Sequence, residues 1–284
     1  MGVKSTLDAH GLRPQKKWGQ NFLTDARILE SIATAADVTS TDTVLEIGPG
    51  LGHLTRVLAA HAKRVVAVEI DAELASKLQN EFVDASKVRI VHGDILKFNP
   101  FDLVREASDS VVEYKVVANL PYYITSAILR HLLEAEHQPR VIVVMVQREV
   151  AQRMIARPPE MNLLAVSVQF FARPRIVRTI AAGAFYPRPK VDSAVVRLEV
   201  VPNLSMSRAE TESFFKIVRA GFGEKRKQLR NSLAQGLTML PQQAEQLLVA
   251  AGIDPSRRAE TLGLDEWSVL HRQWTNMTTD EIEQ

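Results

Sequence analysis

The chain has 284 residues, of which 46% are hydrophobic and 24% charged, and its formal net charge is +2. This length suggests about two domains, and this balance excludes disordered, collagen-like and coiled-coil proteins. The longest apolar run, Val141–Val146, is too short to span a membrane, and the first twenty residues are too polar for a signal peptide. The lack of cysteine excludes disulfides, thiolate metal sites and cysteine nucleophiles. We therefore expect a cytoplasmic globular protein with no membrane partner and no metal site.

Charge is unevenly distributed along the chain. Residues 41–110 hold 11 acidic and 8 basic residues, whereas residues 139–190 hold 9 Lys and Arg against 2 acidic residues. Residues 219–230 add five basic residues against one Glu, and residues 1–20 add four against one Asp. This asymmetry predicts that selected faces of the protein meet a polyanion. The alternative is a solvated surface that is basic by chance.

From Thr43 onward, short β-branched runs alternate with segments of helical periodicity. We expect strands at residues 43–47, 64–69, 87–92, 114–119 and 140–146, with helices that include residues 71–83 and 126–135. Strands that alternate with helices predict an α/β fold with a doubly wound parallel sheet, whose ligand sites lie at the carboxyl ends of the strands. Residues 163–171 and 191–200 are expected to close this sheet as an antiparallel pair of strands.

The remaining segments suggest four parts of the chain. A basic N-terminal arm covers residues 1–24, and the α/β domain covers residues 25–203. Residues 208–275 show helical patterns, with breaks at 236–241 and 252–255, and predict a small all-α C-terminal domain. Residues 276–284 form an acidic tail that we expect to be frayed.

A glycine-rich motif, E-I-G-P-G-L-G (residues 46–52), stands where the first strand should end and a helix should begin. Gly48, Gly50 and Gly52 let the backbone turn sharply and approach a ligand closely. The dinucleotide pattern G-x-G-x-x-G needs a further glycine where His53 stands, whereas G-x-G-x-G after an acidic strand end is typical of S-adenosylmethionine sites. The motif therefore predicts a site for this cofactor, with a purely structural turn as the alternative.

Two carboxylates follow at the next strand ends. Glu69 ends the second strand and is positioned to accept hydrogen bonds from both ribose hydroxyls of a cofactor. Asp71 is a rival for this role, although we interpret it as the cap of the following helix. Asp94 ends the third strand, where it is expected to accept a hydrogen bond from the adenine amino group; the alternative for Asp94 is again a helix cap.

The tetrapeptide N-L-P-Y (residues 119–122) ends the fourth strand and suggests chemistry on an adenine amine. The lone pair of that amine is delocalised into the ring, so the nitrogen is a poor nucleophile. The Asn119 side-chain oxygen and the Leu120 carbonyl can hold both amine hydrogens and pull the nitrogen toward a tetrahedral geometry, and Pro121 fixes the turn. Tyr122 offers a flat surface for an extruded base, worth roughly 1–3 kcal/mol. A strand-ending turn with an aromatic core residue is the alternative.

The whole chain resembles the small-subunit ribosomal RNA adenine N6,N6-dimethyltransferases, the kasugamycin-susceptibility family. Two motifs described above carry the resemblance, together with G-Q-N-F-L (residues 19–23), F-Y-P-R-P-K-V-D-S-A-V-V-R-L (residues 185–198) and the basic F-G-E-K-R-K-Q-L-R-N-S-L (residues 222–233). The resemblance implies a Rossmann-like methyltransferase domain that binds S-adenosylmethionine. It adds Asn21 and Leu23 to the expected cofactor residues; from the residues alone, this segment suggests only a tail before a helix capped by Thr24 or Asp25.

This chain departs from the family pattern at two places. The family usually has Tyr-Gly-x-Leu-Ser where Met161–Ala165 stands here. Asn162 stands in place of the glycine, and because Asn tolerates a left-handed backbone we expect the fold to be kept. This change leaves the local contact, which is a candidate RNA contact, in doubt. His53 stands where a small residue is usual, and we interpret it as a surface residue at a helix start rather than a catalyst.

The resemblance implies that the protein dimethylates two adjacent adenosines near the 3′ end of small-subunit RNA. We expect it to act as a monomer on a precursor of the small (30S) subunit. Phe185 is expected to pack against the target adenine opposite Tyr122, with a core phenylalanine as the alternative. The alternative functions are modification of large-subunit RNA, as in the macrolide-resistance methyltransferases, and a mainly non-catalytic role in ribosome assembly. The expected RNA contacts are the basic residues Arg148, Arg153, Lys190, Lys225, Arg226, Lys227 and Arg230.

Overall fold

The structure, a computed structural model, describes residues 13–15, 18–23, 25–107, 113–201 and 206–280. Most of the predicted N-terminal arm therefore lies outside the described residues, as do Thr24, part of the predicted linker and the last four residues. The chain forms two compact units. The first comprises residues 1–152 and 172–201, and the second comprises residues 153–171 and 202–284.

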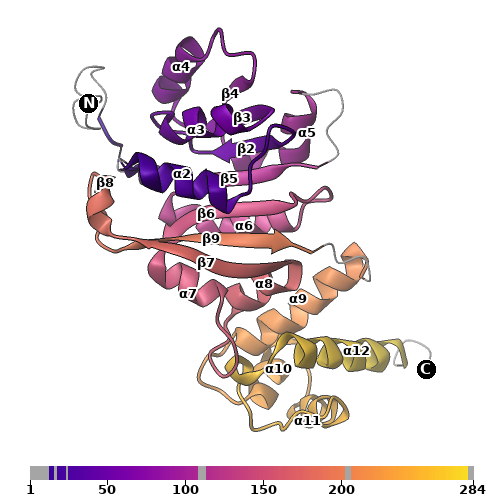
Figure 1. The fold of residues 1–284 in the computed structure, drawn as a ribbon. Coiled ribbons are helices and arrows are strands. Elements are labelled where there is room, and N and C mark those ends of the chain that lie inside the picture. The colour runs from indigo at the N-terminus through magenta and orange to yellow at the C-terminus, as the bar shows by residue number, and fades with distance from the viewer. Residues whose placement is uncertain (1–12, 16–17, 24, 108–112, 202–205, 281–284) are drawn as a thin grey trace. The chain divides into compact units, whose positions relative to one another are not determined.

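The first unit contains all the described strands, together with the helices between residues 26 and 133 (Figure 1). Its elements are β1 (Phe22–Leu23), α2 (Ala26–Ala35), β2 (Thr43–Ile47), α3 (His53–His61), β3 (Arg64–Glu69), α4 (Ala72–Glu81), β4 (Val88–His92), α5 (Pro100–Arg105), β5 (Lys115–Asn119), α6 (Thr125–Leu133), β6 (Val141–Gln147), β7 (Ala172–Ile180), β8 (Phe185–Tyr186) and β9 (Ser193–Val200). Helix α7 (Arg148–Met154) spans the boundary between the two units.

Seven strands form one sheet in the order β4-β3-β2-β5-β6-β9-β7. The first five are parallel, whereas β9 runs antiparallel to both β6 and β7. The predicted doubly wound sheet is therefore confirmed, and the five parallel strands begin and end within one residue of the predicted bounds. The runs of β2, β3, β5 and β6 are buried along almost their whole length, as expected for parallel strands covered on both faces, whereas the edge strand β4 is partly exposed.

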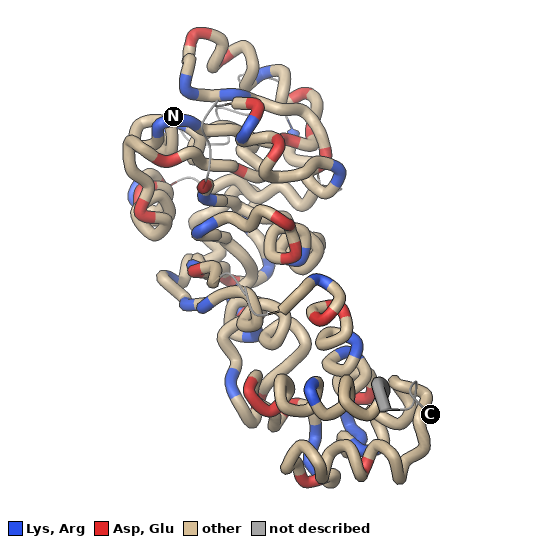
Figure 2. Tube along the Cα trace, turned by 90° about the vertical axis from the view of Figure 1, so that its right-hand side faces the viewer, with Lys and Arg blue, Asp and Glu red and all other residues tan. Residues whose placement is uncertain are grey.

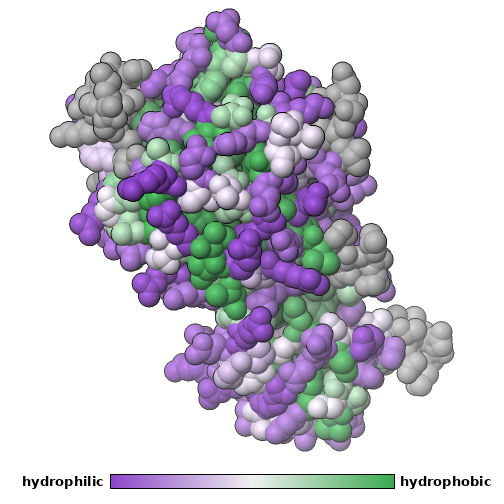
Figure 3. All heavy atoms as spheres, in the orientation of Figure 1, coloured by the Kyte–Doolittle hydropathy of each residue, from purple (hydrophilic) through white to green (hydrophobic). Residues whose placement is uncertain are grey.

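Helices cover the two faces of this sheet. On one face, apolar side chains of α2 and α3, such as Ile32 and Leu58, form a core with Val44, Val143 and Val195 of the strands. On the other face, α5 packs against β2, and Figure 1 shows α6 behind the sheet and α2 in front of it. This arrangement leaves the carboxyl ends of β2, β3 and β5 at one edge of the sheet. The face of the molecule in Figure 3 is mostly hydrophilic, with hydrophobic residues in small separate groups.

The predicted strand at residues 163–171 is wrong: this segment is helix α8 (Leu163–Phe171). A short apolar run cannot be assigned to a strand or a helix by periodicity alone. Asn162 decides the local structure, because its side chain accepts a hydrogen bond from the Ala165 amide at 3.0 Å and its carbonyl accepts one from Val166. Asn162 is not among the residues with a positive φ, so it acts as a helix cap and not as a substitute for a left-handed glycine. The strand that pairs with β9 is β7, which follows α8 directly.

The second unit is helical. It contains α8, α9 (Arg208–Phe222), α10 (Leu229–Gly236), α11 (Pro241–Ala250) and α12 (Leu264–Asp280). Helix α8 belongs here because Phe170 stacks on Phe214 of α9, with ring centroids 4.6 Å apart. Both predicted helix breaks are confirmed. Residues 276–280, assigned to the tail, continue α12, and residues 281–284 lie outside the described chain.

Within the part of the chain that the structure describes, no helix has the length and apolar character needed to cross a membrane.

Candidate active site at the carboxyl edge of the sheet

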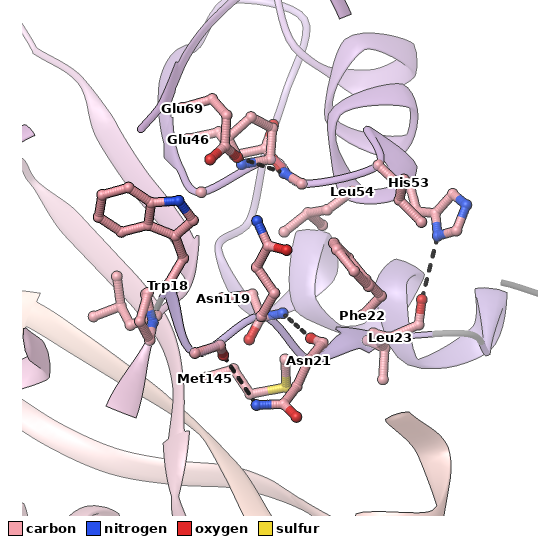
Figure 4. Close-up of a pocket in the computed structure, with 18 of the residues that line it drawn as sticks. Trp18, Asn21, Phe22, Leu23, Glu46, His53, Leu54, Glu69, Asn119 and Met145 are labelled. Atoms are coloured by element: carbon pink, nitrogen blue, oxygen red, sulfur yellow. Dashed lines mark hydrogen bonds between the residues drawn. The ribbon is translucent and has the colours of Figure 1, made fainter. Parts of the chain in front are cut away.

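A cleft lies where β2, β3 and β5 end (Figure 4). The glycine-rich loop forms one part of its wall, and Glu69, Asn119 and the N-L-P-Y segment form another. Residues 18–23 and the α2 side chains Leu29 and Ile32 complete the lining. The structure therefore brings together most of the predicted cofactor and catalytic residues, which are separated by up to a hundred positions in the sequence.

The glycine-rich loop has a backbone that requires glycine. Gly48, Gly50 and Gly52 have φ angles of 73°, 58° and 74°, in the left-handed region. A Cβ atom on Gly50 would lie 3.0 Å from the ring of Phe22, so the site admits no side chain without a shift. The loop leaves its backbone facing the cleft, which is what close binding of a ligand requires.

Glu69 is held at the end of β3 by two backbone donors. Its Oε2 accepts a hydrogen bond from the Gly50 amide and its Oε1 accepts one from the Asp71 amide, both at 3.0 Å. Burial raises the pKa of Glu69, and these two hydrogen bonds oppose that shift. Asp71 instead caps α4 through the Glu73 amide and accepts a hydrogen bond from Gln20. Of these two carboxylates, Glu69 lines the cleft and Asp71 does not.

Glu46 is a cleft residue that the sequence analysis missed. It lies in β2 and is only 1% exposed, and neither carboxyl oxygen has a hydrogen-bond partner among the described residues. Burial, together with the nearby Glu69 carboxylate, raises the pKa of Glu46 to about 8, and the neighbouring Thr55 hydroxyl opposes this rise only in part. An unsatisfied buried carboxyl group is costly, so its presence at the cleft indicates a ligand group that satisfies it. The signal in the sequence was an acidic residue inside a strand that is otherwise apolar.

The segment before α2 is tied to the cleft by Asn119. The Asn119 Nδ2 donates a hydrogen bond to the Asn21 carbonyl at 3.1 Å, and the Asn21 side chain donates to the Gly19 carbonyl (Figure 4). Because Nδ2 is used in this way, the Oδ1 of Asn119 is left without a donor among the described residues and can accept from a ligand. Leu23 follows in β1, which pairs with β8.

His53 is half-buried at the first turn of α3 and lines the cleft. Its Nδ1 lies 3.3 Å from the Leu23 carbonyl, and burial lowers its pKa. The expected position at a helix start is confirmed, but the side chain is not a simple surface residue. Of the two residues considered as caps of α2, Asp25 accepts a hydrogen bond from the Arg27 amide, and Thr24 lies outside the described residues.

Tyr122 lines the cleft, and its hydroxyl lies 2.8 Å from the Oγ of buried Ser193. Burial raises the pKa of Tyr122, so the side chain is a neutral phenol at physiological pH. Ser193 begins β9 in the V-D-S part of the long family motif, and the preceding Asp192 accepts a hydrogen bond from the Ala182 amide. The motif therefore fixes the orientation of the Tyr122 ring and of the adjoining loop.

Two predicted residues lie elsewhere. Phe185 is 5% exposed in the core cluster between α2 and the sheet and does not line the cleft, so the structure favours the core alternative over stacking on a base. Asp94 caps a 3₁₀ turn by accepting a hydrogen bond from the Leu96 amide at 3.0 Å, and it also lies outside the cleft lining. Its neighbour Gly93 is joined to the end of β3, because the Gly93 amide donates to the Glu69 carbonyl at 2.8 Å.

The predicted RNA contacts lie on both units, and Figure 2 shows Lys and Arg on each of them. In the first unit, Arg148 and Lys190 are exposed, and the Arg148 amide donates a hydrogen bond to the Asp192 carbonyl at 2.9 Å. This bond places Arg148 close to the motif that holds Tyr122. In the second unit, Arg153 is exposed at the end of α7.

The basic cluster of the second unit lies mostly in a turn and not on a single helix face. Lys225, Arg226 and Lys227 are exposed in the turn between α9 and α10, so Arg226 and Arg230 do not share a helix face. The physical reason is that α9 ends at Phe222 and α10 begins only at Leu229. Arg230 forms an ion pair with Glu245 at 3.0 Å, and Lys227 approaches Glu224 at 3.8 Å. Lys225 and Arg226 make no ion pair within the described chain.

Comparisons with known proteins identify the family. The profile of the family described as "Ribosomal RNA adenine dimethylase" matches residues 11–273. A protein of Dehalococcoides mccartyi named "Ribosomal RNA small subunit methyltransferase A" is 47% identical over 268 residues, which cover 94% of this chain and 91% of that protein. A protein of Moorella thermoacetica with the same name is 44% identical, with 92% and 93% covered.

Solved structures agree with the fold. The structure titled "Crystal structure of 23S rRNA methyltransferase ErmE" is 27% identical, covers 89% of this chain and 98% of its own, and has a TM-score of 0.68. A dimethyladenosine transferase from Plasmodium falciparum has a TM-score of 0.74 at 23% identity, with 90% and 98% covered. The predicted Rossmann-like methyltransferase fold with added C-terminal helices is therefore confirmed. Together with a family profile that matches most of the chain, these findings show that the protein belongs to the ribosomal RNA adenine dimethylase family.

Proposed function

We propose that this protein transfers methyl groups from S-adenosylmethionine to N6 of two adjacent adenosines in the 3′-terminal hairpin of small-subunit ribosomal RNA, and so forms N6,N6-dimethyladenosine. The observation that carries the proposal is the orientation of Asn119, whose amide nitrogen is bound to Asn21 and whose oxygen is left to accept from a ligand. The names of the relatives that are 44–47% identical supply the class of RNA. The protein would act in the cytoplasm, as a monomer, on a precursor of the small subunit.

The cleft fits S-adenosylmethionine. Glu69 has lone pairs left for ribose hydroxyls, and the glycine-rich loop leaves room beside it for the methionine part. The two unpartnered oxygens of Glu46 suit the cationic ammonium group of the cofactor. Beyond the cleft lining, the Asp94 Oδ2, which is not the oxygen that caps the 3₁₀ turn, would accept from the adenine amino group. When bound, this cofactor supplies an electrophilic methyl group on a positively charged sulfur.

The chain itself activates and orients the adenine amine. The Asn119 Oδ1 and the Leu120 carbonyl would each accept one amine hydrogen, which turns the nitrogen lone pair away from the ring and toward the methyl group. These acceptors interact most strongly with the positive charge that develops on nitrogen, so they lower the barrier. The amine becomes acidic once it is alkylated and can lose its proton to water, so the site needs no strong general base. Tyr122, held by Ser193, would stack on the extruded base.

The test is transfer of labelled methyl groups to small subunits that lack the modification, followed by nucleoside analysis. We expect labelled N6,N6-dimethyladenosine from the wild-type protein, and at least a hundredfold less from Asn119→Ala at saturating RNA. Cofactor affinity is measured separately for this variant, because Asn119 also lines the cofactor cleft. Previously methylated subunits serve as the control and should accept no label.

The alternative functions give different outcomes in the same assay. Label that appears in large-subunit RNA would assign the macrolide-resistance type of activity. If the wild-type protein and Asn119→Ala both bind small subunits and neither transfers labelled methyl groups, the protein has a non-catalytic role in assembly. Turnover of Asn119→Ala within threefold of wild type would contradict the role given to this side chain.

A further inference from the structure

The outer strand of the sheet, β7, carries a row of three arginines. Arg173, Arg175 and Arg178 are all exposed, and none of them is among the RNA contacts named above. In the antiparallel pairing with β9, they stand opposite Glu199, Arg197 and Val195. These three β9 positions alternate along the strand, so their side chains share one face of the sheet, and the three arginines share that face with them. We call these three residues the arginine row.

A β-bulge aligns the row. Arg173 and Arg175 are two residues apart and lie on the same face, but Arg178 is three residues further and would face the other way in a regular strand. The register shifts between Ile176 and Arg178, so Val177 is an extra residue that turns Arg178 back to the first face. The bulge therefore places three cations in line, one at every second position of the ladder, roughly 7 Å apart.

The arginine row lies on the face of the sheet that α2 covers, and α2 also lines the catalytic cleft. Val195, opposite Arg178, belongs to the core under α2, and Arg178 reaches the hydroxyl of Ser31 on α2 at 3.5 Å. Leu29 and Ile32 of the same helix line the cleft. Ser193, which holds Tyr122, is only two residues along β9 from the partner of Arg178. The row thus begins next to the catalytic loop and runs away from it along the edge of the sheet.

The row has an uncompensated positive charge. Buried Arg197 occupies both nearby carboxylates, since it binds Asp37 at 2.6 Å and Glu199 at 3.0 Å. The arginines of the row make no ion pair within the described residues, so the row, Arg197 and its two carboxylates together carry a net charge of +2. The opposite edge strand differs, because the Arg89 of β4 is paired with Glu106.

We propose that the arginine row binds successive phosphates of the RNA strand that leaves the catalytic cleft. This proposal rests on the proposed function and names the path of its substrate. Arginine binds phosphate through two parallel hydrogen bonds, and contacts of this kind position an RNA without reading its sequence. The rival explanation is that charge protects the edge strand from pairing with other chains. Pro174 and the bulge already interrupt this edge, and edge protection does not require the three charges to share one face.

The test compares two triple variants with the same loss of charge. Arg173→Gln, Arg175→Gln and Arg178→Gln together remove the row, and Lys63→Gln, Lys87→Gln and Lys97→Gln together remove three exposed lysines on the β3–β4 side of the sheet. We expect the row variant to bind unmethylated small-subunit RNA about tenfold more weakly, with a salt slope lower by roughly 2, while its cofactor affinity is unchanged. The lysine variant should keep the salt slope of the wild type.

A charge reversal separates phosphate binding from edge protection. The variant with Glu at all three positions of the row keeps the edge charged, so edge protection alone predicts wild-type RNA affinity and a soluble protein. Phosphate binding predicts a larger loss of RNA affinity than in the Gln variant, with the three lysines changed to Glu as the matched control. An unchanged salt slope in a row variant that is folded and binds the cofactor would overturn the proposal. Absence of methyl transfer by the wild-type protein would instead count against the proposed function.

Discussion

At the scale of single residues, two neighbouring carboxyl groups of the cleft have different surroundings. Glu69 receives two backbone hydrogen bonds, which favour its charged form, whereas Glu46 receives none from the described chain and is fully buried. Glu69 is therefore suited to accept hydrogen bonds from neutral hydroxyl groups, whereas Glu46 needs a cationic partner before it ionises.

Glu69→Ala should weaken S-adenosylmethionine binding by about 1–3 kcal/mol, because two ribose hydroxyls lose a charged acceptor. Titration calorimetry measures this change. Asp71→Asn is the control, since Asp71 caps α4 outside the cleft lining and its change should affect stability more than affinity. Wild-type affinity in Glu69→Ala, with a loss in Asp71→Asn, would move the ribose site to Asp71.

Glu46 should make the stability of the protein depend on pH. Its pKa is about 8 in the folded protein and 4.5 as its ordinary value, so between these values the folded state holds a proton that the unfolded state has lost. Its contribution to the free energy of unfolding is fully present below pH 4.5 and is lost as the pH rises through 8. As the pH rises from 5 to 9, the free energy of unfolding of Glu46→Gln should therefore increase relative to that of wild type by on the order of 1–4 kcal/mol.

Denaturant unfolding of Glu46→Gln and of wild type at both pH values measures this difference. Glu73→Gln is the control, because Glu73 is exposed on α4. Parallel pH profiles for wild type and Glu46→Gln would show that the Glu46 carboxyl is ionised in the folded protein throughout this range.

At the scale of elements, the two-residue strands β1 and β8 connect distant segments at the cleft. Leu23 pairs with Phe185 and Phe22 with Tyr186, so the segment that carries Asn21 is attached to the loop that precedes β9. Strands this short have no signal in the sequence, because periodicity needs four or more residues to be recognised. Phe185 is a core residue of this connection.

Phe185→Leu should lower the free energy of unfolding by about 1 kcal/mol, because a smaller side chain fills the same buried space less well. Turnover should stay close to wild type at temperatures where the variant is folded. Thermal unfolding and methyl transfer measure the two effects, and Tyr122→Leu is the matched control, expected to lose turnover. Reduced turnover of Phe185→Leu with unchanged stability would restore the stacking role.

At the scale of the whole molecule, positive charge is presented by both compact units. Lys225 and Arg226 are exposed in the second unit without an ion pair in the described chain, whereas Arg230 is paired with Glu245. Changing Lys225 and Arg226 to Ala should lower the salt slope of RNA binding by up to about 0.9 for each phosphate that is no longer neutralised, with cofactor affinity unchanged. Arg230→Ala is the control, and its effect on the slope should be smaller. An unchanged salt slope in the variant that lacks Lys225 and Arg226 would mean that the RNA phosphates are bound by the first unit.

Much of this architecture could be predicted because it depends on local sequence. The five parallel strands, the glycine loop and the caps at Asp25 and Asp71 each follow from residue types within a few positions. The resemblance of the sequence to a family added Asn21 and Leu23. The helix at residues 163–171 was not predicted, because its apolar run fits a buried strand equally well. The cap at Asn162 and the packing of Phe170 on Phe214 decide between them.

The sequence by itself determined the fold class, the glycine-rich loop and the tetrapeptide, because these depend on short motifs and on the period of apolar residues. Only the tertiary structure decided which side chains face the cleft. It placed Glu46 at the cleft without a partner, removed Phe185 from it, and turned Asn119 toward Asn21. The alignment of the arginine row was likewise hidden, because a bulge of one residue changes the face of Arg178 while the spacing along the chain suggests the opposite. Burial and register arise from contacts between distant segments, and no local pattern contains them.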